Sequence, residues 1–337
     1  MSQRRVWITW ESHRRSRGLA AGLGATLHEI AERGSRLRRY LHSVGQTFRV
    51  LFSARGGVVI VQSPSIVLAN LATTFGGLAG VKVVVDAHNG GIDPLEGKSA
   101  MLSWLARRAL RKSDLVIVTN RALATQVESF GAKAFVLTDP MPDFPGVSGA
   151  KVGEAPTMSR VVAICTWASD EPYLELLRAA ALLPPQCELA ITGRSRLTES
   201  QRASLPANVR LTGFVSESDY TDLLRTADVI VDLTTRENCL LCGAYEAVSV
   251  HKPLVVSDTA ALRDLLGSAS LYCRNEAPAI AAAITSALEQ RSGLAEHARQ
   301  RDAALRSQWK RHRDDLDRLL IQLASPAPGR HQPADIK

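Results

Sequence analysis

Residues 228–258 read DVIVDLTTRENCLLCGAYEAVSVHKPLVVSD, and this stretch contains the repeating unit of the fold. The run VIV between its first two aspartates is short, apolar and β-branched, which is typical of a buried parallel strand. From Cys242 to Val250 the apolar spacing becomes helical, and a lysine-proline pair ends that helix before a second strand at 254–257. In a doubly wound sheet, the loop after a strand and the N-terminus of the next helix bind ligands. We therefore expect a ligand site at this loop.

The alternation of strand and helix extends over the rest of the chain. Short runs rich in valine and isoleucine recur, and stretches with helical spacing follow them. This rhythm predicts the α/β class, with two Rossmann-like parallel-sheet domains that face a cleft. The segment 139–149, with three prolines and two glycines, separates the domains. We expect an N-terminal domain at 1–145, a C-terminal domain at 156–323 whose final helix can pack back on the first, and a disordered tail at 324–337.

The composition excludes several classes of protein. The 337 residues contain no run of eighteen apolar residues, so we expect no transmembrane helix, and the N-terminus lacks the pattern of a signal peptide. Five cysteines are an odd number and predict no disulfide framework, which fits a reducing cytoplasm. Cys239 and Cys242 have the spacing of a metal or redox pair. Because no second pair of ligands accompanies them, we favour packing beside a ligand loop.

Positive charge is concentrated in the N-terminal half. Residues 1–150 hold 19 of the 41 lysines and arginines but only 10 of the 33 acidic residues, so the net charge of +8 arises there. A helix expected at 35–55 has an apolar and a basic face. That pattern fits an ordinary core-packed helix and also a helix that docks on an anionic membrane, here the inner face of the cell membrane. No basic groove with interleaved aromatic residues occurs, so we expect no nucleic-acid binding.

Two glutamates mark the loop and the helix of the opening stretch. Glu246 lies one turn into the expected helix, and Glu237 lies in the loop before it, with eight residues between them. Together with VRLTGFV at 209–215 and KPLVVSD at 252–258, they resemble the donor-binding domain of GT-B glycosyltransferases, most closely the retaining family 4 type. That family places seven residues between its two glutamates. Either Glu237 on a one-residue bulge or Asn238 therefore takes the first position.

The resemblance implies a site for a nucleotide-diphosphate sugar in the C-terminal domain. It makes Glu246 a ligand of the nucleotide ribose and places backbone groups of Gly213 and Val215 against the base. Arg194 is the remaining phosphate cation, because the loop at 165–170 lacks one, and the family's glycines before the helix are missing. Further expected donor contacts are Thr166, Cys239, Leu240, Leu241 and Cys242.

In the N-terminal domain, His88 follows a buried strand at 81–86. The resemblance makes His88 a contact of the donor sugar and the transition state, in a catalytic set with Glu237 and Asn238; a solvated loop histidine is the alternative. Asn120 is expected first to cap a helix and second to contact the acceptor. The loop after the first strand suits an anionic acceptor such as a diphosphate-linked lipid, although a solvated basic loop is equally consistent. Its charged residues are Glu11, His13, Arg14, Arg15 and Arg17.

These features predict a hexosyltransferase-type glycosyltransferase (EC 2.4) of the retaining class. It would transfer a sugar from a nucleotide-diphosphate sugar to a lipid-linked or polysaccharide acceptor in envelope glycan synthesis, in the cytoplasm. We expect no cofactor and no metal, because neither ligand loop carries paired aspartates of the D-x-D type. Two alternatives remain open. One is a sugar-nucleotide epimerase with the same fold; the other is a non-catalytic relative that acts as a scaffold, which the incomplete set of phosphate cations favours.

Overall fold

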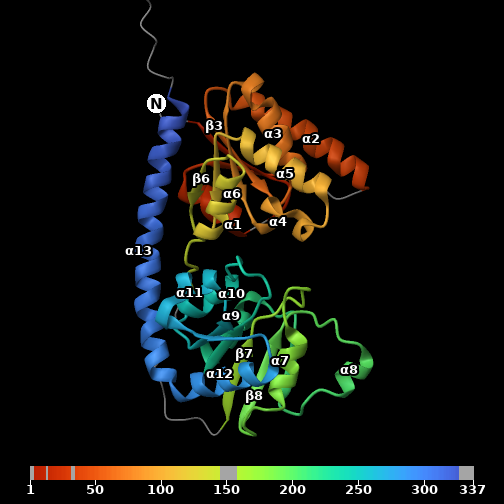
Figure 1. Cartoon of the computed structure of the whole chain (residues 1–337), viewed down its shortest axis with the longest axis vertical. Coiled ribbons are helices and arrows are strands. Elements are labelled where there is room, and N and C mark those ends of the chain that lie inside the picture. The colour runs from red at the N-terminus through yellow and green to blue at the C-terminus, as the bar shows by residue number, and fades with distance from the viewer. Residues whose placement is uncertain (1–3, 13, 32–34, 145–157, 326–337) are drawn as a thin grey trace, which may run out of the picture. The chain divides into compact units, whose positions relative to one another are not determined.

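The computed structural model describes residues 4–12, 14–31, 35–144 and 158–325. It divides into two compact units (Figure 1). Unit 1 comprises Met1–Pro140 and Trp309–Lys337, and unit 2 comprises Met141–Gln308. The tail predicted at 324–337 lies outside the described residues from 326 onward, and Ala324 is the last residue of a helix.

Unit 1 is built on a six-stranded sheet in which neighbouring strands are parallel. Its central strands are β-branched and buried, as in Val58–Ser63, because helices cover both faces of the sheet. The strand order is β2-β1-β3-β4-β5-β6, so the order along the chain reverses between β1 and β3. The carboxyl ends of those two strands form a topological switch point, where doubly wound sheets bind ligands. The strands are β1 (Arg5–Thr9), β2 (Thr26–Glu29), β3 (Val58–Ser63), β4 (Lys82–Ala87), β5 (Leu115–Val118) and β6 (Ala134–Val136).

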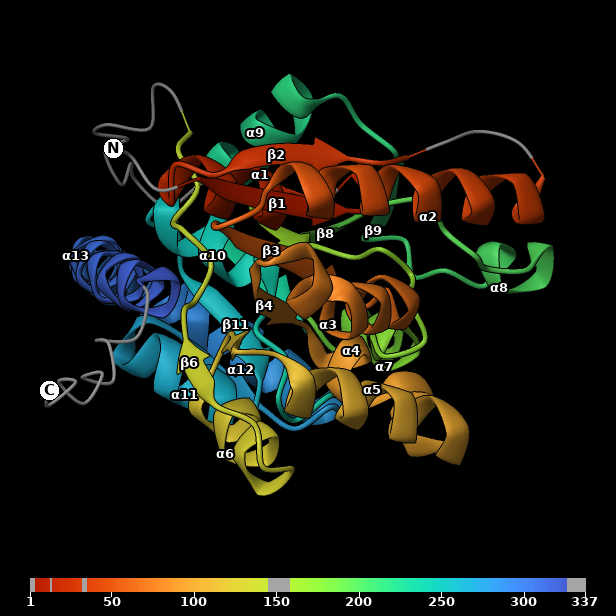
Figure 2. The ribbon, with the colours of Figure 1, turned by 90° about the horizontal axis from the view of Figure 1, so that it is seen from above.

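Successive residues of β1 pack into different layers of unit 1, because side chains alternate along a strand. Ile8 belongs to the core formed with α2, α3, α5 and α6, and Figure 2 shows α2, α3 and α5 side by side. Trp7 faces the other layer, where it packs with Leu19 of α1 and Leu316 of α13. The helices are α1 (Arg14–Gly22), α2 (Arg36–Ser53), α3 (Ile66–Ala79), α4 (Asn89–Ile92), η1 (Pro94–Gly97), α5 (Ala100–Lys112), α6 (Arg121–Ser129) and α13 (Arg291–Ala324), which begins in unit 2.

Unit 2 repeats this architecture with a second parallel six-stranded sheet. Its strand order is β12-β11-β10-β7-β8-β9, so the switch point lies between β7 and β10. The opening stretch of sequence supplies β10, the loop after it, α10 and β11, as predicted. The strands are β7 (Ser159–Ala163), β8 (Cys187–Thr192), β9 (Val209–Gly213), β10 (Val229–Asp232), β11 (Leu254–Ser257) and β12 (Leu271–Cys273).

Helices also cover both faces of the sheet in unit 2. Val231 belongs to the core formed with α7 and α12, whereas Ile230 packs with α9, α10 and α11. The helices are α7 (Tyr173–Ala180), α8 (Glu199–Ala203), α9 (Glu217–Thr226), α10 (Cys242–Ser249), α11 (Ala260–Leu266), η2 (Gly267–Ala269) and α12 (Ala277–Glu289).

The predicted fold class, two Rossmann-like parallel-sheet domains, is confirmed. The helix predicted at 35–55 is α2, but its two halves differ. Val50 and Leu51 are buried, whereas Leu37 and Leu41 near its start are 71% and 66% exposed. The first half of α2 is therefore not the core-packed helix that one interpretation expected. In the part of the chain that the structure describes, no helix is both long and apolar enough to cross a membrane.

Candidate active site

His88 lies immediately beyond β4, and its side chain keeps 24% of its surface exposed. Its Nε2 atom is 3.3 Å from Oδ2 of Asp86, the residue two positions earlier. Residues i and i+2 of an extended strand project on the same side, so the strand itself brings these two groups together. Asp86 is fully buried. The predicted catalytic histidine thus stands at the carboxyl end of a central strand with a buried carboxylate beneath it.

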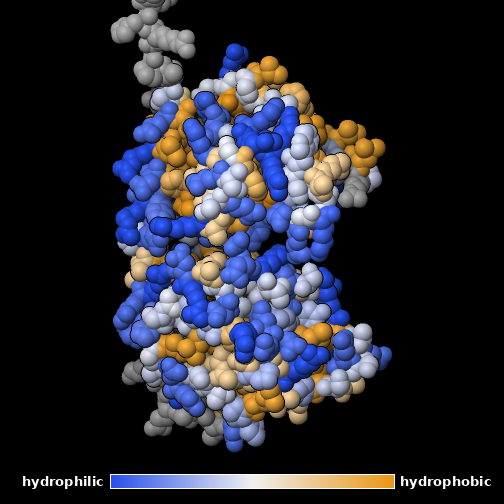
Figure 3. Space-filling model, viewed as in Figure 1, coloured by the Kyte–Doolittle hydropathy of each residue, from blue (hydrophilic) through white to orange (hydrophobic). Residues whose placement is uncertain are grey.

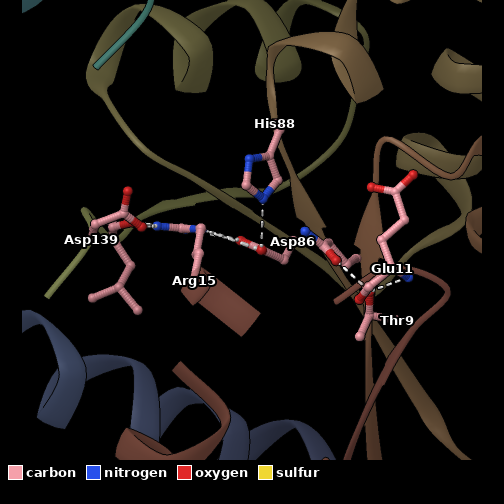
Figure 4. Close-up of polar contacts among 8 residues, drawn as sticks. Thr9, Glu11, Arg15, Asp86, His88 and Asp139 are labelled. Atoms are coloured by element: carbon pink, nitrogen blue, oxygen red, sulfur yellow. Dashed lines mark hydrogen bonds and ion pairs between the residues drawn. The ribbon is translucent and has the colours of Figure 1, made fainter. Parts of the chain in front are cut away.

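Arg15, from the first turn of α1, holds this carboxylate (Figure 4). Its Nη2 donates to Oδ1 of Asp86 at 2.9 Å and to the carbonyl of Leu137 at 3.1 Å, and its Nη1 pairs with Asp139. Burial raises the pKa of Asp86, but the Arg15 charge and the bond from His88 outweigh it and leave that pKa well below its usual range. Burial lowers the pKa of Arg15, but the two carboxylates outweigh this and raise it. Arg15 is therefore an internal ion-pair residue, not the acceptor contact that we expected.

A pocket of about 450 Å³ opens in unit 1 beside its switch point. Thr9 at the end of β1 hydrogen-bonds Gln62 at the end of β3, which joins the two strands there. Trp10, the next residue, lines the pocket, and its indole Nε1 donates to Thr47 of α2 at 3.0 Å. The lining combines apolar surface with one cation and one carboxylate: Trp10, Glu11, Ile30, Arg39, Tyr40, Ser43, Pro64, Ser65, Ile66, Val67 and Leu102.

The residues predicted to bind the acceptor do not form one cluster. Glu11 lines the pocket. Arg17 is exposed and pairs with Glu29 of β2 at 2.9 Å. Asn120 is buried and caps α6, where its Oδ1 accepts from the backbone N–H of Leu123 at 3.0 Å, so its predicted capping role is confirmed. Two predicted contacts remain, His13 and Arg14. His13 and the side chain of Arg14 lie outside the described part of the chain.

In unit 2, Glu246 and Asp232 are two buried carboxylates beside the switch point. The hydroxyl of Tyr220 on α9 donates to Glu246. Asp232, the last residue of β10, accepts from the backbone N–H groups of Gly243 and Ala244, the second and third residues of α10. Burial raises the pKa of Asp232 well above its usual range, and the charges of Glu246 and Glu171 raise it further.

Gly243 fits this arrangement because any side chain would strike the carboxylate. A Cβ atom at position 243 would lie 2.4 Å from Oδ2 of Asp232 and 2.6 Å from Cδ1 of Ile164. The small residue lets the start of α10 approach the end of β10. The first N–H groups of α10 are therefore bonded to a side chain of the protein itself.

The loop after β7 binds a carboxylate of its own. Glu171 accepts from the backbone N–H and the hydroxyl of Thr166, at 3.0 and 2.7 Å, and from the N–H of Ala168 at 3.0 Å. Trp167 between them has a φ of +62°, rare for a side chain of this size, and its indole donates to Thr192. The predicted donor contact Thr166 thus already bonds an internal anion, in the loop where the resemblance expects a cation.

Both candidates for the first-glutamate position, Glu237 and Asn238, lie in the loop between β10 and α10, but their surroundings differ. The carboxylate of Glu237 accepts from the backbone N–H of Ala260 at 2.8 Å and so caps α11. Asn238, the next residue, is half-buried. Leu240 and Leu241 pack partly against the core under α10. Cys242 is exposed and Cys239 is half-buried, and both lie in or next to this loop.

Loop geometry keeps β8 and β9 together at their carboxyl ends. Gly193 donates its N–H to the carbonyl of Gly213 at 3.0 Å, and a Cβ at position 193 would lie 2.1 Å from the carbonyl oxygen of Cys165. Arg194 follows and is exposed. Gly213 has a φ of +68°, and the predicted base contact Val215 is half-buried beyond it.

Two family models match the chain. The model described as "Glycosyl transferase 4-like domain" matches residues 4–137, and the model "Glycosyl transferases group 1" matches residues 159–290. Together they cover most of both units. The chain belongs to the GT-B glycosyltransferases of the family 4 type. That membership confirms the predicted enzyme class, a hexosyltransferase-type glycosyltransferase.

Solved structures share the fold of this glycosyltransferase over nearly its whole length. HepE of Anabaena, crystallised with UDP, is 14% identical with a TM-score of 0.73, covering 95% of this chain and 100% of its own. Sucrose-phosphate synthase of Thermosynechococcus elongatus is 14% identical with a TM-score of 0.73, covering 95% of this chain and 99% of its own. The lipopolysaccharide outer core galactosyltransferase WaaB, in its apo form, is 12% identical with a TM-score of 0.67, covering 94% of this chain and 99% of its own. No curated protein matches the sequence.

Three residues of these sites were not singled out from the sequence. In the sequence, Asp86 was predicted only to end a strand. Its position two residues before His88 could have indicated that the two side chains lie on the same side of the strand. Glu171 and Tyr220 carried no signal, because each meets its partner through the folded sheet edge and not through a motif.

Proposed function

We propose that this glycosyltransferase transfers a sugar from a uridine-diphosphate sugar to a lipid-linked acceptor, with retention of configuration. The observation that carries the donor assignment is the buried Glu246 beside the switch point of unit 2, held by Tyr220. A carboxylate at this position suits a ribose diol, whose two hydroxyls both donate. HepE has been crystallised with UDP and with UDP-glucose, which supports the choice of base and of a hexose.

The phosphates and the sugar would be bound by different groups. Arg194 and the loop amides from Cys239 to Cys242 would hold the diphosphate, and positive charge there would stabilise it as it leaves. His88 would contact the transferred sugar in the transition state. Of the two remaining catalytic candidates we choose Asn238, because Glu237 already caps α11. With no paired catalytic carboxylates assigned, the departing phosphate would accept the proton of the attacking hydroxyl. The reaction would need no metal and no cofactor.

The acceptor assignment rests on unit 1. The pocket at its switch point has aromatic and aliphatic walls with Arg39 among them, which suits an amphiphile with an anionic head. Exposed Leu37 and Leu41 lie near Arg38 and Arg39 at the start of α2, where Figure 3 shows an apolar group at the surface. This combination supports docking on an anionic bilayer, at the cytoplasmic face of the membrane, in envelope glycan synthesis.

The direct test is a transfer assay with a panel of nucleotide sugars and membrane lipid extract, with products resolved by mass spectrometry and NMR. The proposal expects an α-linked lipid product from an α-linked UDP-sugar, and equal rates with and without EDTA. Release of a C2-epimeric sugar in the absence of acceptor would instead identify an epimerase. Loss of transfer in EDTA that magnesium restores would contradict metal independence.

A second candidate, a non-catalytic scaffold, is favoured by one observation. The N–H and hydroxyl groups of Thr166 and the N–H of Ala168, in the loop after β7, already donate hydrogen bonds to Glu171. This loop therefore has no cation and few remaining hydrogen-bond donors with which to bind a phosphate. Calorimetry that detects no binding of any nucleoside diphosphate would favour the scaffold.

A further inference from the structure

Arg15 and Asp86 form a buried pair directly behind His88 (Figure 4). Their side chains are 3% and 0% exposed, so neither offers a surface to a substrate. The shortest contact of Asp86 with Arg15 is made by Oδ1, which lies 2.9 Å from Nη2. Its Oδ2 lies 3.3 Å from Nε of Arg15 and 3.3 Å from Nε2 of His88. The partly exposed imidazole of His88 is the group through which we expect the pair to act on a substrate.

Hydrogen-bond chemistry determines which group donates in the 3.3 Å contact between His88 and Asp86. A guanidinium has donors only, and an ionised carboxylate accepts only. A buried aspartate without a cation would be neutral, but Arg15 pairs with Asp86 at close range and so keeps it ionised. The imidazole nitrogen that faces Asp86 must then carry a proton. In a neutral ring this is the Nε2–H tautomer, with Nδ1 as the acceptor.

We propose that Asp86 and Arg15 are positioning residues that fix His88 as the Nε2–H tautomer and hold its ring at the end of β4. This inference rests on the proposed function, in which His88 contacts the transferred sugar. Arg15 also pairs with Asp139 and with the carbonyl of Leu137. The guanidinium therefore joins three separate segments of unit 1 at the histidine: α1, β4 and the chain just before Pro140.

The decisive variant is Asp86→Asn, which preserves shape but removes one acceptor. Arg15 has donors only, and its shortest contact, 2.9 Å, is to Oδ1, so we expect the amide oxygen to take that position and the amide NH₂ to face Nε2 of His88. Nε2 must become an acceptor, so the ring should change to the Nδ1–H tautomer. This change can be read in the full-length protein from the ¹⁵N shifts of labelled histidine at alkaline pH, with His88→Gln to assign the signal. The matched control is Asp317→Asn, which makes the same change in another arginine–aspartate pair of unit 1, with Arg5.

We expect Nε2–H in the wild type and in Asp317→Asn, and Nδ1–H in Asp86→Asn. With the wrong tautomer, kcat for transfer should fall about 100-fold, while the KM for the nucleotide sugar changes little because unit 2 binds the nucleotide. An unchanged tautomer in Asp86→Asn would overturn the inference and leave the proposed function intact. A changed tautomer with unchanged kcat would remove His88 from the reaction and make the pair structural only. If Asp86→Asn does not fold, the wild-type spectrum decides, because an Nδ1–H ring there contradicts the inference.

Discussion

Asp86 and Asp232 are both buried aspartates at the carboxyl ends of parallel strands, yet their electrostatic surroundings are opposite. Asp86 meets the guanidinium of Arg15, which holds its pKa below the usual range in spite of burial. Asp232 is buried near Glu246 and Glu171, and its pKa is raised. Asp86 therefore stays ionised and can accept a hydrogen bond from His88. Asp232 tends toward the neutral form, which lessens repulsion beside the proposed ribose ligand.

The raised pKa of Asp232 makes a sign-specific prediction for stability. Between the unfolded pKa of about 3.9 and the higher folded pKa, the folded state binds more protons, so this group lowers the free energy of unfolding as pH rises. The loss should reach about 1.4 kcal/mol per pH unit within that window. Asp232→Asn removes the titration, so denaturant unfolding should show the variant gaining on the wild type as the pH rises above about 4. The control, Asp222→Asn, changes an exposed pair with Arg225. A wild type that gains on Asp232→Asn over this range would contradict the assignment.

Glu237 and Asn238 can be separated by their variants. Glu237→Ala removes the acceptor for the N–H of Ala260 and should lower the free energy of unfolding by about 1 kcal/mol. Asn238→Ala should reduce kcat more than Glu237→Ala does, because we place Asn238 in the catalytic set. Denaturant titrations and initial rates on the same preparations check both statements. If Glu237→Ala abolishes transfer and Asn238→Ala does not, the one-residue bulge is correct and the catalytic assignment passes to Glu237.

At the scale of elements, strands were more predictable than short helices. Runs such as Val58–Ser63 and Leu254–Ser257 are β-branched and buried on both faces, so composition alone indicates them. The short helices α4 and α8 are missing from the predictions because Asn89–Ile92 and Glu199–Ala203 are too brief to show periodicity. A capping box, Thr198 with Gln201, was the one local signal for α8.

Polar contacts between side chains of different elements could not be predicted. Arg15 and Asp86 are 71 residues apart in sequence, and a loop dense in arginines gave no reason to bury one of them. The place of Glu246 in the fold was predictable for a different reason. A carboxylate one turn into a helix after a buried strand is a local pattern, and the fold fixes its position relative to the switch point.

The start of α2 gives an element-scale prediction for membrane docking. Leu37→Ser with Leu41→Ser should weaken binding to vesicles of anionic lipid at least tenfold, because each leucine would otherwise transfer apolar surface into the bilayer. Vesicle sedimentation measures this directly. Leu78→Ser, at a similarly exposed position on α3, serves as the control and should bind like the wild type. Equal binding by all three proteins would exclude α2 as the docking element.

At the scale of the whole molecule, each unit has its own parallel sheet and its own switch point. Family models match each unit separately, over 4–137 and 159–290. We propose that the two units also have separate functions. Unit 2 would bind the nucleotide through Glu246, and unit 1 would provide His88 and the acceptor pocket. Nucleotide binding can therefore be tested without knowledge of the acceptor.

Calorimetric titration of UDP into the wild type and Glu246→Gln tests the central claim most directly. The wild type should bind UDP, and the amide should weaken binding about 10- to 100-fold, because the ribose hydroxyls lose a charged acceptor. Glu289→Gln, an exposed glutamate at the end of α12, should bind like the wild type. Equal affinity in Glu246→Gln, or no binding of UDP by the wild type, would contradict the assignment of unit 2 as the site of a uridine nucleotide.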